Sequence, residues 1–286
     1  MSTLGPLWDR LNTGIRYFRA YRNFPSVAIA RAIGRFPTSA ILRRSRTIVT
    51  LRSASEAYYV SWYESLGWRY DSAMNIVYVP YNGTLPFLGG LTGGDLIGVF
   101  ATRIYDSLDV KGRVVIDIGA SIGDSAIYFA LQGAAKVYAF EPEAQACNQA
   151  AQNVVNNGVS QSVSMVHAGL GEEFTTTAHT EPQGVPNGEV PNPSHPRWFA
   201  SLNDVVAAYD VRDGILKMDC EGCEYPALSG SSLALQAFHQ VQIEYHRGIQ
   251  DLAAILEHSG FAIRILPRSR STGEILGTRV RSSGPR

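Results

Sequence analysis

The chain has 286 residues, of which 45% are hydrophobic, enough to fill the core of one large domain with an appendage or of two small domains. Three cysteines argue against a disulfide-stapled secreted domain, and no apolar run approaches the roughly 18 residues that a transmembrane helix needs. The N-terminus has no uninterrupted apolar segment of the signal-peptide kind, so a cytoplasmic protein is the default expectation.

The formal net charge of zero conceals an uneven distribution of charge. Residues 1–55 contain ten Arg and a single acid, Asp9. Such a segment suits an anionic partner, whether a phosphorylated substrate, an acidic membrane surface or a nucleic acid. A solvated basic face, balanced by an acidic remainder of the chain, is an equally good interpretation. Pro25 and Pro37 interrupt the short apolar groups of this segment, so we expect short helices and loops.

The next segment, residues 57–98, is aromatic and rich in glycine. Its stretches YYVSWYESLGWRYD and VYVPYNGTLPFLGG predict a few strands and turns rather than long helices. The aromatic side chains either stack a sugar or apolar acceptor or form the core of a small N-terminal unit, and we favour the core; they are Tyr58, Tyr59, Trp62, Tyr63, Trp68 and Tyr70. Residues 1–94 are therefore expected to form an extension, on the substrate side or as a cap.

From Asp95 the pattern changes to that of an α/β domain, expected over 95–286. DLIGVFATRIYDSL has helical spacing, and apolar stretches then recur at VVIDI, KVYAF, VSMVHA, GILKMD, QVQIEY and FAIRIL. Strands that alternate with helices predict a parallel sheet. FAIRIL and EILGTRV, separated by a polar stretch with a glycine, predict an antiparallel pair. Residues 171–196 hold five prolines and predict a surface insertion that could act as a lid.

The stretch VVIDIGASIGDSAIYFA predicts a strand, a turn and a helix, with the turn at the edge of the sheet where ligands bind. Gly119 and Gly123 allow a sharp turn and a close backbone approach to a ligand, although they could also merely close the turn. The order around Ser121 does not fit the GxGxxG pattern of dinucleotide binding. Asp124 and Ser125 could cap the helix start.

Glu141 ends the next predicted strand, 18 residues beyond Gly123. A carboxylate at this place can accept both hydrogen bonds from a ribose diol. This would suit NAD as well as S-adenosylmethionine, and a solvated acid at a strand end is the remaining alternative.

A second motif, GILKMDCEGCEYPALSG, runs from an apolar strand through three acids into a helix. Its CxxC pair, Cys220 and Cys223, raises the alternatives of zinc binding and redox chemistry. Zinc would need two further ligands, and the neighbouring acids disfavour a thiolate. We therefore interpret both cysteines as small residues in variable positions, with a chance disulfide as the remaining alternative.

Together with the AFEP ending, SLNDVV and QIEYH, the segments DIGASIGD and KMDCEGCE resemble the FkbM-type methyltransferase family, over roughly residues 114–266. The resemblance implies an α/β, Rossmann-like class I methyltransferase fold, with a mostly parallel seven-stranded sheet, a terminal antiparallel strand and here a small N-terminal extension. It also implies S-adenosylmethionine as methyl donor and usually a hydroxyl of a small molecule or glycan as acceptor.

By the same resemblance, Asp117, Gly119, Ser121 and Gly123 are expected to line the methionine side of the cofactor, and Glu141 to hold its ribose. No metal site is expected.

The general base that would activate a hydroxyl acceptor is expected among Asp219, Glu221 and His246. The resemblance places the two acids at the reaction cleft, and alternation along QIEYH puts Glu244 and His246 on one face. The ordinary pKa of His, near 6.5, suits a base, although a single His at a strand end is more often structural. Lys217, Asp219 and Glu244 could instead form a buried charge network.

The favoured function is thus an S-adenosylmethionine-dependent O-methyltransferase with a small-molecule or glycan acceptor. Two alternatives remain at this point. One is an NAD-dependent oxidoreductase, which the glycine spacing disfavours. The other is a nucleic-acid or membrane-surface binding module that uses the Arg-rich N-terminus, with nucleic acid the less favoured partner.

Overall fold

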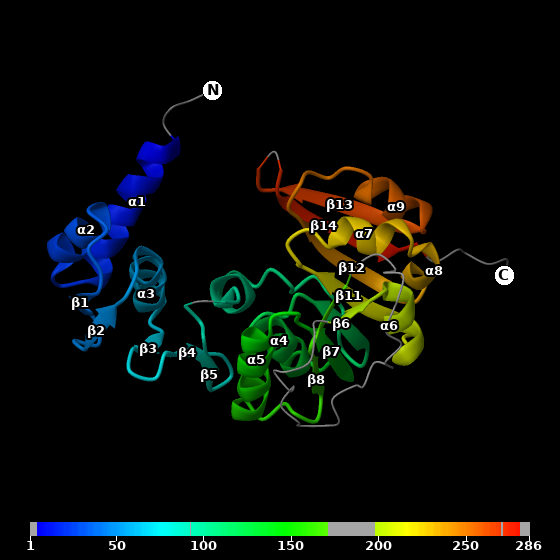
Figure 1. Cartoon of the computed structure of the whole chain (residues 1–286), viewed down its shortest axis with the longest axis horizontal. Coiled ribbons are helices and arrows are strands. Elements are labelled where there is room, and N and C mark those ends of the chain that lie inside the picture. The colour runs from blue at the N-terminus through cyan, green and yellow to red at the C-terminus, as the bar shows by residue number, and fades with distance from the viewer. Residues whose placement is uncertain (1–4, 92, 171–197, 270, 281–286) are drawn as a thin grey trace. The chain divides into compact units, whose positions relative to one another are not determined.

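The computed structural model describes residues 5–91, 93–170, 198–269 and 271–280 (Figure 1). The chain divides into two compact units, Met1–Leu96 and Ile97–Arg286. The insertion expected at residues 171–196 lies outside the described residues. None of the helices in the described ranges combines the length and the apolar character that crossing a bilayer requires.

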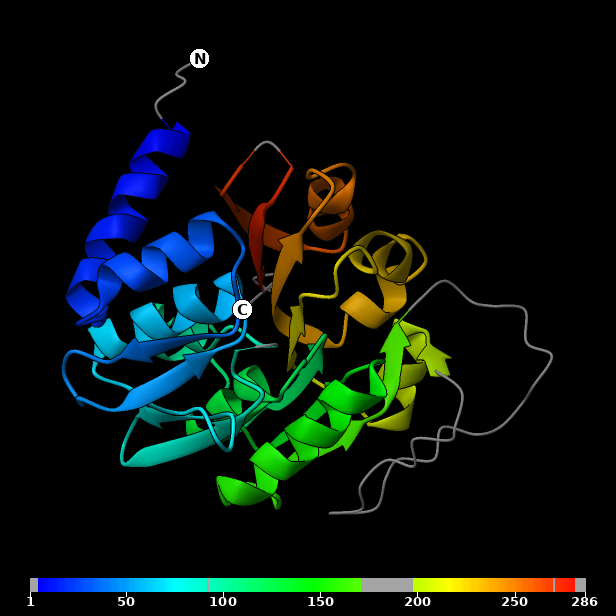
Figure 2. The same ribbon diagram turned by 60° about the vertical axis from the view of Figure 1, so that its left-hand side comes forward.

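The N-terminal unit combines three helices with two small antiparallel sheets. The helices are α1 (Gly5–Ala20), α2 (Phe24–Ala32) and α3 (Ala54–Leu66). The strands are β1 (Thr38–Ile41) and β2 (Ile48–Leu51), which form a hairpin, and β3 (Arg69–Asp71), β4 (Ile76–Pro80) and β5 (Thr84–Leu88), which form a three-stranded sheet. Figure 2 shows α1 and α2 crossing beside the hairpin. The expectation of short helices and loops missed both the 16-residue α1 and the hairpin.

The prediction of strands and turns was wrong for the first part of the aromatic segment, which forms α3. The Ser53 side chain accepts a hydrogen bond from the Glu56 N–H and caps the helix start. Gly67, at φ 76°, ends the helix in the left-handed conformation. These caps, with the burial of Ala57, Val60 and Tyr63 on one face, outweigh the preference of aromatic residues for strands.

The aromatic side chains of this segment divide into two groups. Tyr63, Trp68 and Tyr70 are buried in the core of the N-terminal unit, and Tyr63 stacks on Trp68 with ring centroids 5.5 Å apart. Tyr58, Tyr59 and Trp62 are only half-buried. The expected core role therefore holds for the first group alone.

The C-terminal unit is built on one seven-stranded sheet. Its strands are β6 (Val114–Ile118), β7 (Lys136–Phe140), β8 (Val163–Val166), β11 (Gly214–Met218), β12 (Phe238–Tyr245), β13 (Phe261–Pro267) and β14 (Gly273–Arg279). Their order is β13-β14-β12-β11-β6-β7-β8, and β14 runs antiparallel to both of its neighbours while the remaining pairs are parallel. The expected class I fold and the expected antiparallel pair are thus confirmed. Two further short strands, β9 (Ala168–Leu170) and β10 (Trp198–Ala200), pair with each other.

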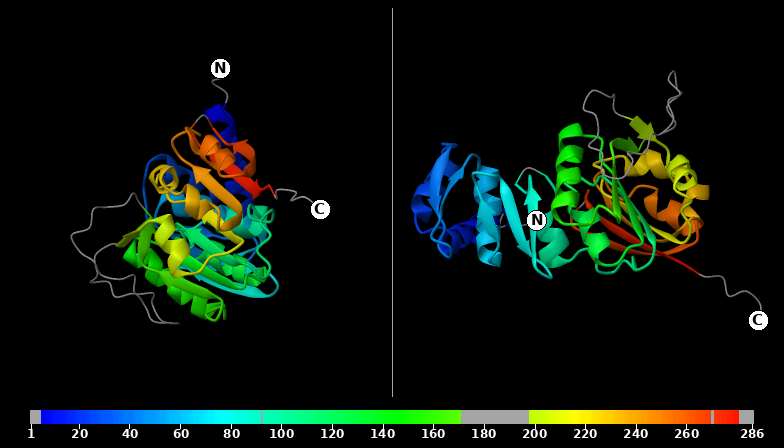
Figure 3. Two further views of the ribbon diagram at one scale, coloured as in Figure 1. Left: turned by 90° about the vertical axis from the view of Figure 1, so that its right-hand side faces the viewer. Right: turned by 90° about the horizontal axis from the view of Figure 1, so that it is seen from below.

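Helices cover both faces of this sheet. They are α4 (Asp124–Leu131), α5 (Ala144–Asn156), α6 (Leu202–Ala208), α7 (Glu224–Ser229), α8 (Ser232–Leu235) and α9 (Leu252–His258). Figure 3 shows α4 and α5 on one face and the later helices on the other. All five residues of β11 are consequently buried, as expected for a central parallel strand. The helix expected over DLIGVFATRIYDSL is reduced to a π-helical turn, η1 (Ile97–Thr102), because Arg103 adopts φ 57° directly after it.

The strand order reverses at β6, with β7 and β8 on one side and β11 and β12 on the other. In open parallel sheets the ligand site lies at the carboxyl ends of the strands where the order reverses. The loops that follow β6, β7, β11 and β12 carry the motif residues Gly119, Glu141, Asp219 and His246.

Candidate active site

The loop after β6 turns in the left-handed conformation at Gly119 (φ 77°), Ser121 (φ 47°) and Gly123 (φ 81°). A Cβ on Gly119 would lie 1.8 Å from the backbone oxygen of Asp219, and one on Gly123 would lie 3.1 Å from the Ala150 Cβ. The two glycines therefore leave room for the β11 loop and for α5. This packing requirement differs from the close approach to a ligand that the sequence suggested.

The helix after this loop has Gly123 as its N-cap, without a side-chain cap. The expectation that Asp124 and Ser125 cap the helix was wrong for Ser125, whose hydroxyl donates to Asp117 Oδ2 over 2.6 Å. That hydrogen bond draws the Ser125 side chain towards the sheet rather than towards the free N–H groups.

Asp117 and Lys217 form an ion pair across the adjacent strands β6 and β11, with Nζ and Oδ1 3.0 Å apart. Asp117 is fully buried and Lys217 is nearly so. Lys217 also donates to the Gly119 carbonyl over 2.9 Å. Burial lowers the pKa of Lys217, but Asp117, Tyr105 and Asp219 together outweigh burial and raise it. The ammonium thus stays charged and ties the β6 loop to the sheet.

Two sequence expectations bear on this pair. Lys217 was expected in a network with Asp219 and Glu244, and its direct partner is instead Asp117, because the register places those two residues opposite each other. Asp117 was expected on the cofactor side, and the contacts of its carboxylate are internal, to Lys217 and Ser125. Its role towards the cofactor remains a prediction.

Glu141 follows β7, and backbone groups fix its carboxylate. Oε2 accepts a hydrogen bond from the Ser121 N–H and Oε1 one from the Glu143 N–H, both at 2.8 Å. Burial raises the pKa of Glu141, and these two bonds oppose the rise. Each carboxylate oxygen can accept a second hydrogen bond, so the side chain is suited to a diol such as that of a ribose.

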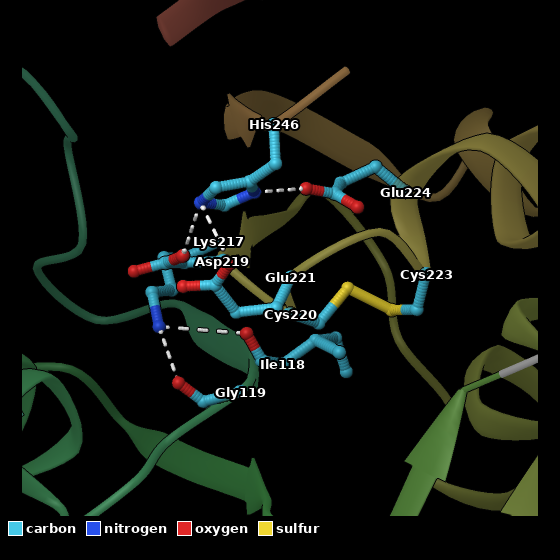
Figure 4. Close-up of a disulfide and its surroundings, with 9 residues drawn as sticks. All are labelled: Ile118, Gly119, Lys217, Asp219, Cys220, Glu221, Cys223, Glu224 and His246. Carbon is cyan, nitrogen blue, oxygen red and sulfur yellow. Dashed lines mark hydrogen bonds and ion pairs between the residues drawn. A yellow bond between two sulfur atoms is a disulfide. The ribbon is translucent and has the colours of Figure 1, made fainter. Parts of the chain in front are cut away.

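The β11 loop carries a disulfide between Cys220 and Cys223, whose Cα atoms are 5.5 Å apart (Figure 4). The interpretation of both cysteines as merely small residues in variable positions was therefore wrong, and the disulfide alternative holds. The turn that leads into α7 brings the two residues to within bonding distance. Between them, Glu221 adopts φ 56° and extends an 83% exposed side chain.

His246 directly follows β12 and is held by Glu224, the first residue of α7. Its Nδ1 lies 2.7 Å from Glu224 Oε1, and the Glu224 carboxylate is fully buried (Figure 4). Because a carboxylate only accepts, the hydrogen of the neutral imidazole lies on Nδ1, and Nε2 then carries the lone pair. Nε2 lies 3.6 Å from both Asp219 Oδ1 and Glu221 Oε2. The structure thus brings the three expected catalytic residues together.

Sequence reasoning missed Glu224 as the partner of His246. The only local signal was its place at the head of a short helix that continues with the mostly apolar YPAL, which favours burial of the first turn. Glu224 and His246 are 22 positions apart with a complete strand between them, so their contact depends on the fold.

The acids around His246 shift its pKa. Burial lowers the pKa, but the hydrogen bond with Glu224 and the charges of Glu221 and Asp219 outweigh burial, and the pKa lies above 6.5. Glu244, whose Oε1 is 3.8 Å from Nε2, is affected more strongly. Burial and the charge of Asp219 raise its pKa to about 7, against the opposing influence of Arg268 and His246. Perturbed groups of this kind gather at functional sites.

The same side chains could hold a metal ion, although the sequence predicted none. Asp219, Glu221 and His246 each offer one ligand atom, and these atoms lie within 4.8 Å of one another. The Glu224 carboxylate on Nδ1 is the type of partner that orients metal-bound histidines. The arrangement can therefore take up either a proton or a divalent cation at Nε2.

Comparison with protein families matches residues 117–263 to the methyltransferase FkbM domain. The matched range is just over half of the 286 residues. It begins at Asp117 and includes Glu141, the β11 loop and His246, so it contains the whole candidate site.

The uncharacterized protein 158B of Sulfolobus islandicus rod-shaped virus 1 is 32% identical to the chain over 120 residues, which are 42% of this chain and 54% of that protein. The chain thus spans about half the length of this relative. Among solved structures, the methyltransferase FkbM of Methylobacillus flagellatus is 18% identical, with a TM-score of 0.45 over 63% of this chain and 47% of that one. An rRNA methylase of Streptococcus thermophilus is 13% identical, with a TM-score of 0.40 over 61% of this chain and 90% of that one.

Proposed function

Because the chain belongs to the FkbM methyltransferase family, we propose that it transfers the methyl group of S-adenosylmethionine to a hydroxyl oxygen of a small molecule or glycan. Methyl transfer is the activity of this domain family, and the hydroxyl acceptor is the part of the proposal that goes beyond the family. The observation that carries the addition is the Glu224–His246 pair, which leaves the lone pair of the neutral imidazole on Nε2, at the carboxyl edge of the sheet.

The glycine spacing of the β6 loop favours S-adenosylmethionine over NAD, whereas Glu141 would suit the ribose of either cofactor. Glu141 offers two fixed carboxylate oxygens to a ribose diol. The β6 loop lacks the GxGxxG spacing that places a pyrophosphate on a helix N-terminus. Gly119, Ser121 and Gly123 would then lie along the methionine part of the cofactor.

When bound, S-adenosylmethionine supplies an activated methyl group on its sulfonium, so the protein mainly needs to align the acceptor and exclude water. A hydroxyl becomes a good nucleophile only as its proton leaves, and Nε2 of His246 takes that proton. Asp219 and Glu221, each 3.6 Å from Nε2, stabilise the imidazolium that forms. Glu224 keeps the proton on Nδ1 and so preserves the reactive tautomer.

Binding and transfer are tested separately. Thermal shifts with S-adenosylmethionine, S-adenosylhomocysteine and NAD report the cofactor, since a ligand at ~100 Kd stabilises the folded state by about 2.7 kcal/mol. We expect shifts with the two adenosyl compounds alone, and a shift with NAD alone would overturn the cofactor assignment. Transfer of a labelled methyl group to a panel of hydroxylated small molecules, glycans and RNA then tests the acceptor. Labelling of RNA bases alone would refute the hydroxyl acceptor while leaving the cofactor assignment intact.

A further inference from the structure

The N-terminal unit contains a groove of about 1020 Å³ that methyl transfer does not explain. Five of its lining residues are arginines: Arg16, Arg19, Arg31, Arg43 and Arg44. They come from three separate places, since the first two lie one turn apart on α1, the third lies on α2 and the last two follow β1. The fold of this unit thus places five of the ten arginines of residues 1–55 around one groove.

Aromatic rings orient the arginine at the centre of this set. The guanidinium of Arg16 lies 4.5 Å from the ring centroid of Tyr58 and 4.3 Å from that of Trp62, two residues on one face of α3. Arg16 Nε is buried and has no hydrogen-bond partner among the described residues. The stacked guanidinium is therefore held in one plane. Nε itself is enclosed and Nη2 donates to the Thr13 hydroxyl over 3.4 Å, so Nη1 is the nitrogen left to donate to a ligand.

A second arginine is oriented by a hydrogen bond. Arg31 donates from Nη1 to the Tyr17 hydroxyl over 2.8 Å. A neutral hydroxyl fixes this guanidinium without neutralising its charge, and the remaining donors of Arg31 can bind an anion.

The positive charge of the groove is largely uncompensated. None of the five arginines forms an ion pair with a described carboxylate, whereas Arg52, outside the groove, pairs with Glu56. Glu64 is the single acid among the described lining residues, and it accepts a hydrogen bond from the Arg44 backbone N–H. Five cations around one carboxylate attract an anion of more than one charge.

We propose that this groove binds the phosphate groups of a small phosphorylated ligand, of the diphosphate type. Arginine pairs with phosphate oxygens through two parallel hydrogen bonds, which makes it suited to this ligand. The volume is that of a small-molecule site. A single-stranded nucleic acid would need free aromatic faces for base stacking, and Arg16 already covers Tyr58 and Trp62. The inference rests on the N-terminal unit alone and is independent of the methyltransferase activity.

The test is calorimetric titration of the full chain with inorganic pyrophosphate. The groove variant Arg16→Gln/Arg31→Gln is compared with Arg35→Gln/Arg46→Gln, which removes the same charge from the same unit outside the groove. We expect binding to wild type and control, and at least about tenfold weaker binding to the groove variant, because charge-assisted hydrogen bonds are lost. If pyrophosphate affinity falls equally in both variants, the binding depends only on the overall positive charge, and the groove is not the binding site.

Additional experiments identify the molecule that carries the phosphate and control for misfolding of the variant. Arg19→Gln, an exposed change on α1, replaces the double variant if that variant loses its thermal transition, with Arg35→Gln as its control. A nucleoside diphosphate should compete with pyrophosphate for the groove. Binding of phosphatidylglycerol vesicles or of single-stranded RNA, without binding of pyrophosphate, would overturn the proposal in favour of a surface for that macromolecule.

Discussion

The buried carboxylate of Glu224 lies 2.7 Å from Nδ1 of His246 and turns the opposite nitrogen towards Asp219 and Glu221. One carboxylate thus selects the tautomer, and two others lie where a positive charge would form. A proton-accepting site would need this division of roles among the acids, which an acidic surface alone does not supply.

Replacing His246 with Gln should lower kcat by about 10²–10⁴-fold, because the proton acceptor is removed. The affinity for S-adenosylmethionine should be unchanged in a binding titration. His258→Gln, at the exposed end of α9, is the matched control and should keep full activity. Activity that EDTA abolishes and Mg²⁺ restores would instead assign Asp219, Glu221 and His246 to a metal site.

Replacing Glu224 with Gln should shift the pH profile of kcat to lower pH. Glu224 is one of the groups that raise the pKa of His246, and the neutral amide no longer raises it. A general base is active when unprotonated, so wild-type activity should rise with pH through a midpoint above 6.5, and the midpoint of the variant should be lower. Coincident profiles would mean that His246 does not titrate in the rate-limiting step.

Replacing Glu141 with Gln should weaken S-adenosylmethionine binding by about 10–100-fold, the loss expected for hydrogen bonds to a charged acceptor. Glu143→Gln is the control for this change. Glu143 accepts hydrogen bonds from the Gln145 and Ala146 N–H groups at the start of α5, through one carboxylate oxygen each, and the amide oxygen of Gln can replace one of the two. Equal loss of affinity in both variants, measured by calorimetry, would point to a general disturbance of the β7 loop.

Replacing Lys217 with Met should lower the free energy of unfolding by about 3–5 kcal/mol, because Asp117 would remain buried without its counter-charge. Arg212→Met breaks the exposed pair with Asp210, whose side chains are 82% and 77% exposed, and should cost less than about 1 kcal/mol. Urea unfolding of the two variants measures the contrast. Similar midpoints would contradict a buried charged pair.

Replacing Gly119 with Ala should disrupt the site, because the new Cβ would lie 1.8 Å from the Asp219 backbone oxygen. Gly158→Ala has a similar φ, 69° against 77°, but meets no atom within 4 Å. The control should therefore show only the backbone strain, of order 1 kcal/mol. If both variants have the same thermal midpoint and cofactor affinity, the two loops are not locked together as described.

Local pattern predicted most of the C-terminal unit. The apolar runs marked the strands of the sheet, and the turn between the last two marked their antiparallel pairing, because alternation and turn composition are properties of neighbouring residues. The same reasoning failed for α3, where capping by Ser53 and Gly67 decided against the strand preference of its aromatic residues.

The sequence by itself determined the family, the strand pattern and the candidate site residues, since each depends on short motifs. Only the tertiary structure decided which charges meet. The crossovers of the sheet bring Lys217 to Asp117, 100 positions away, and His246 to Glu224. In the N-terminal unit, the packing of helices and hairpin gathers five arginines around one groove. Partner choice between distant residues depends on strand order and helix packing, and no local periodicity encodes either.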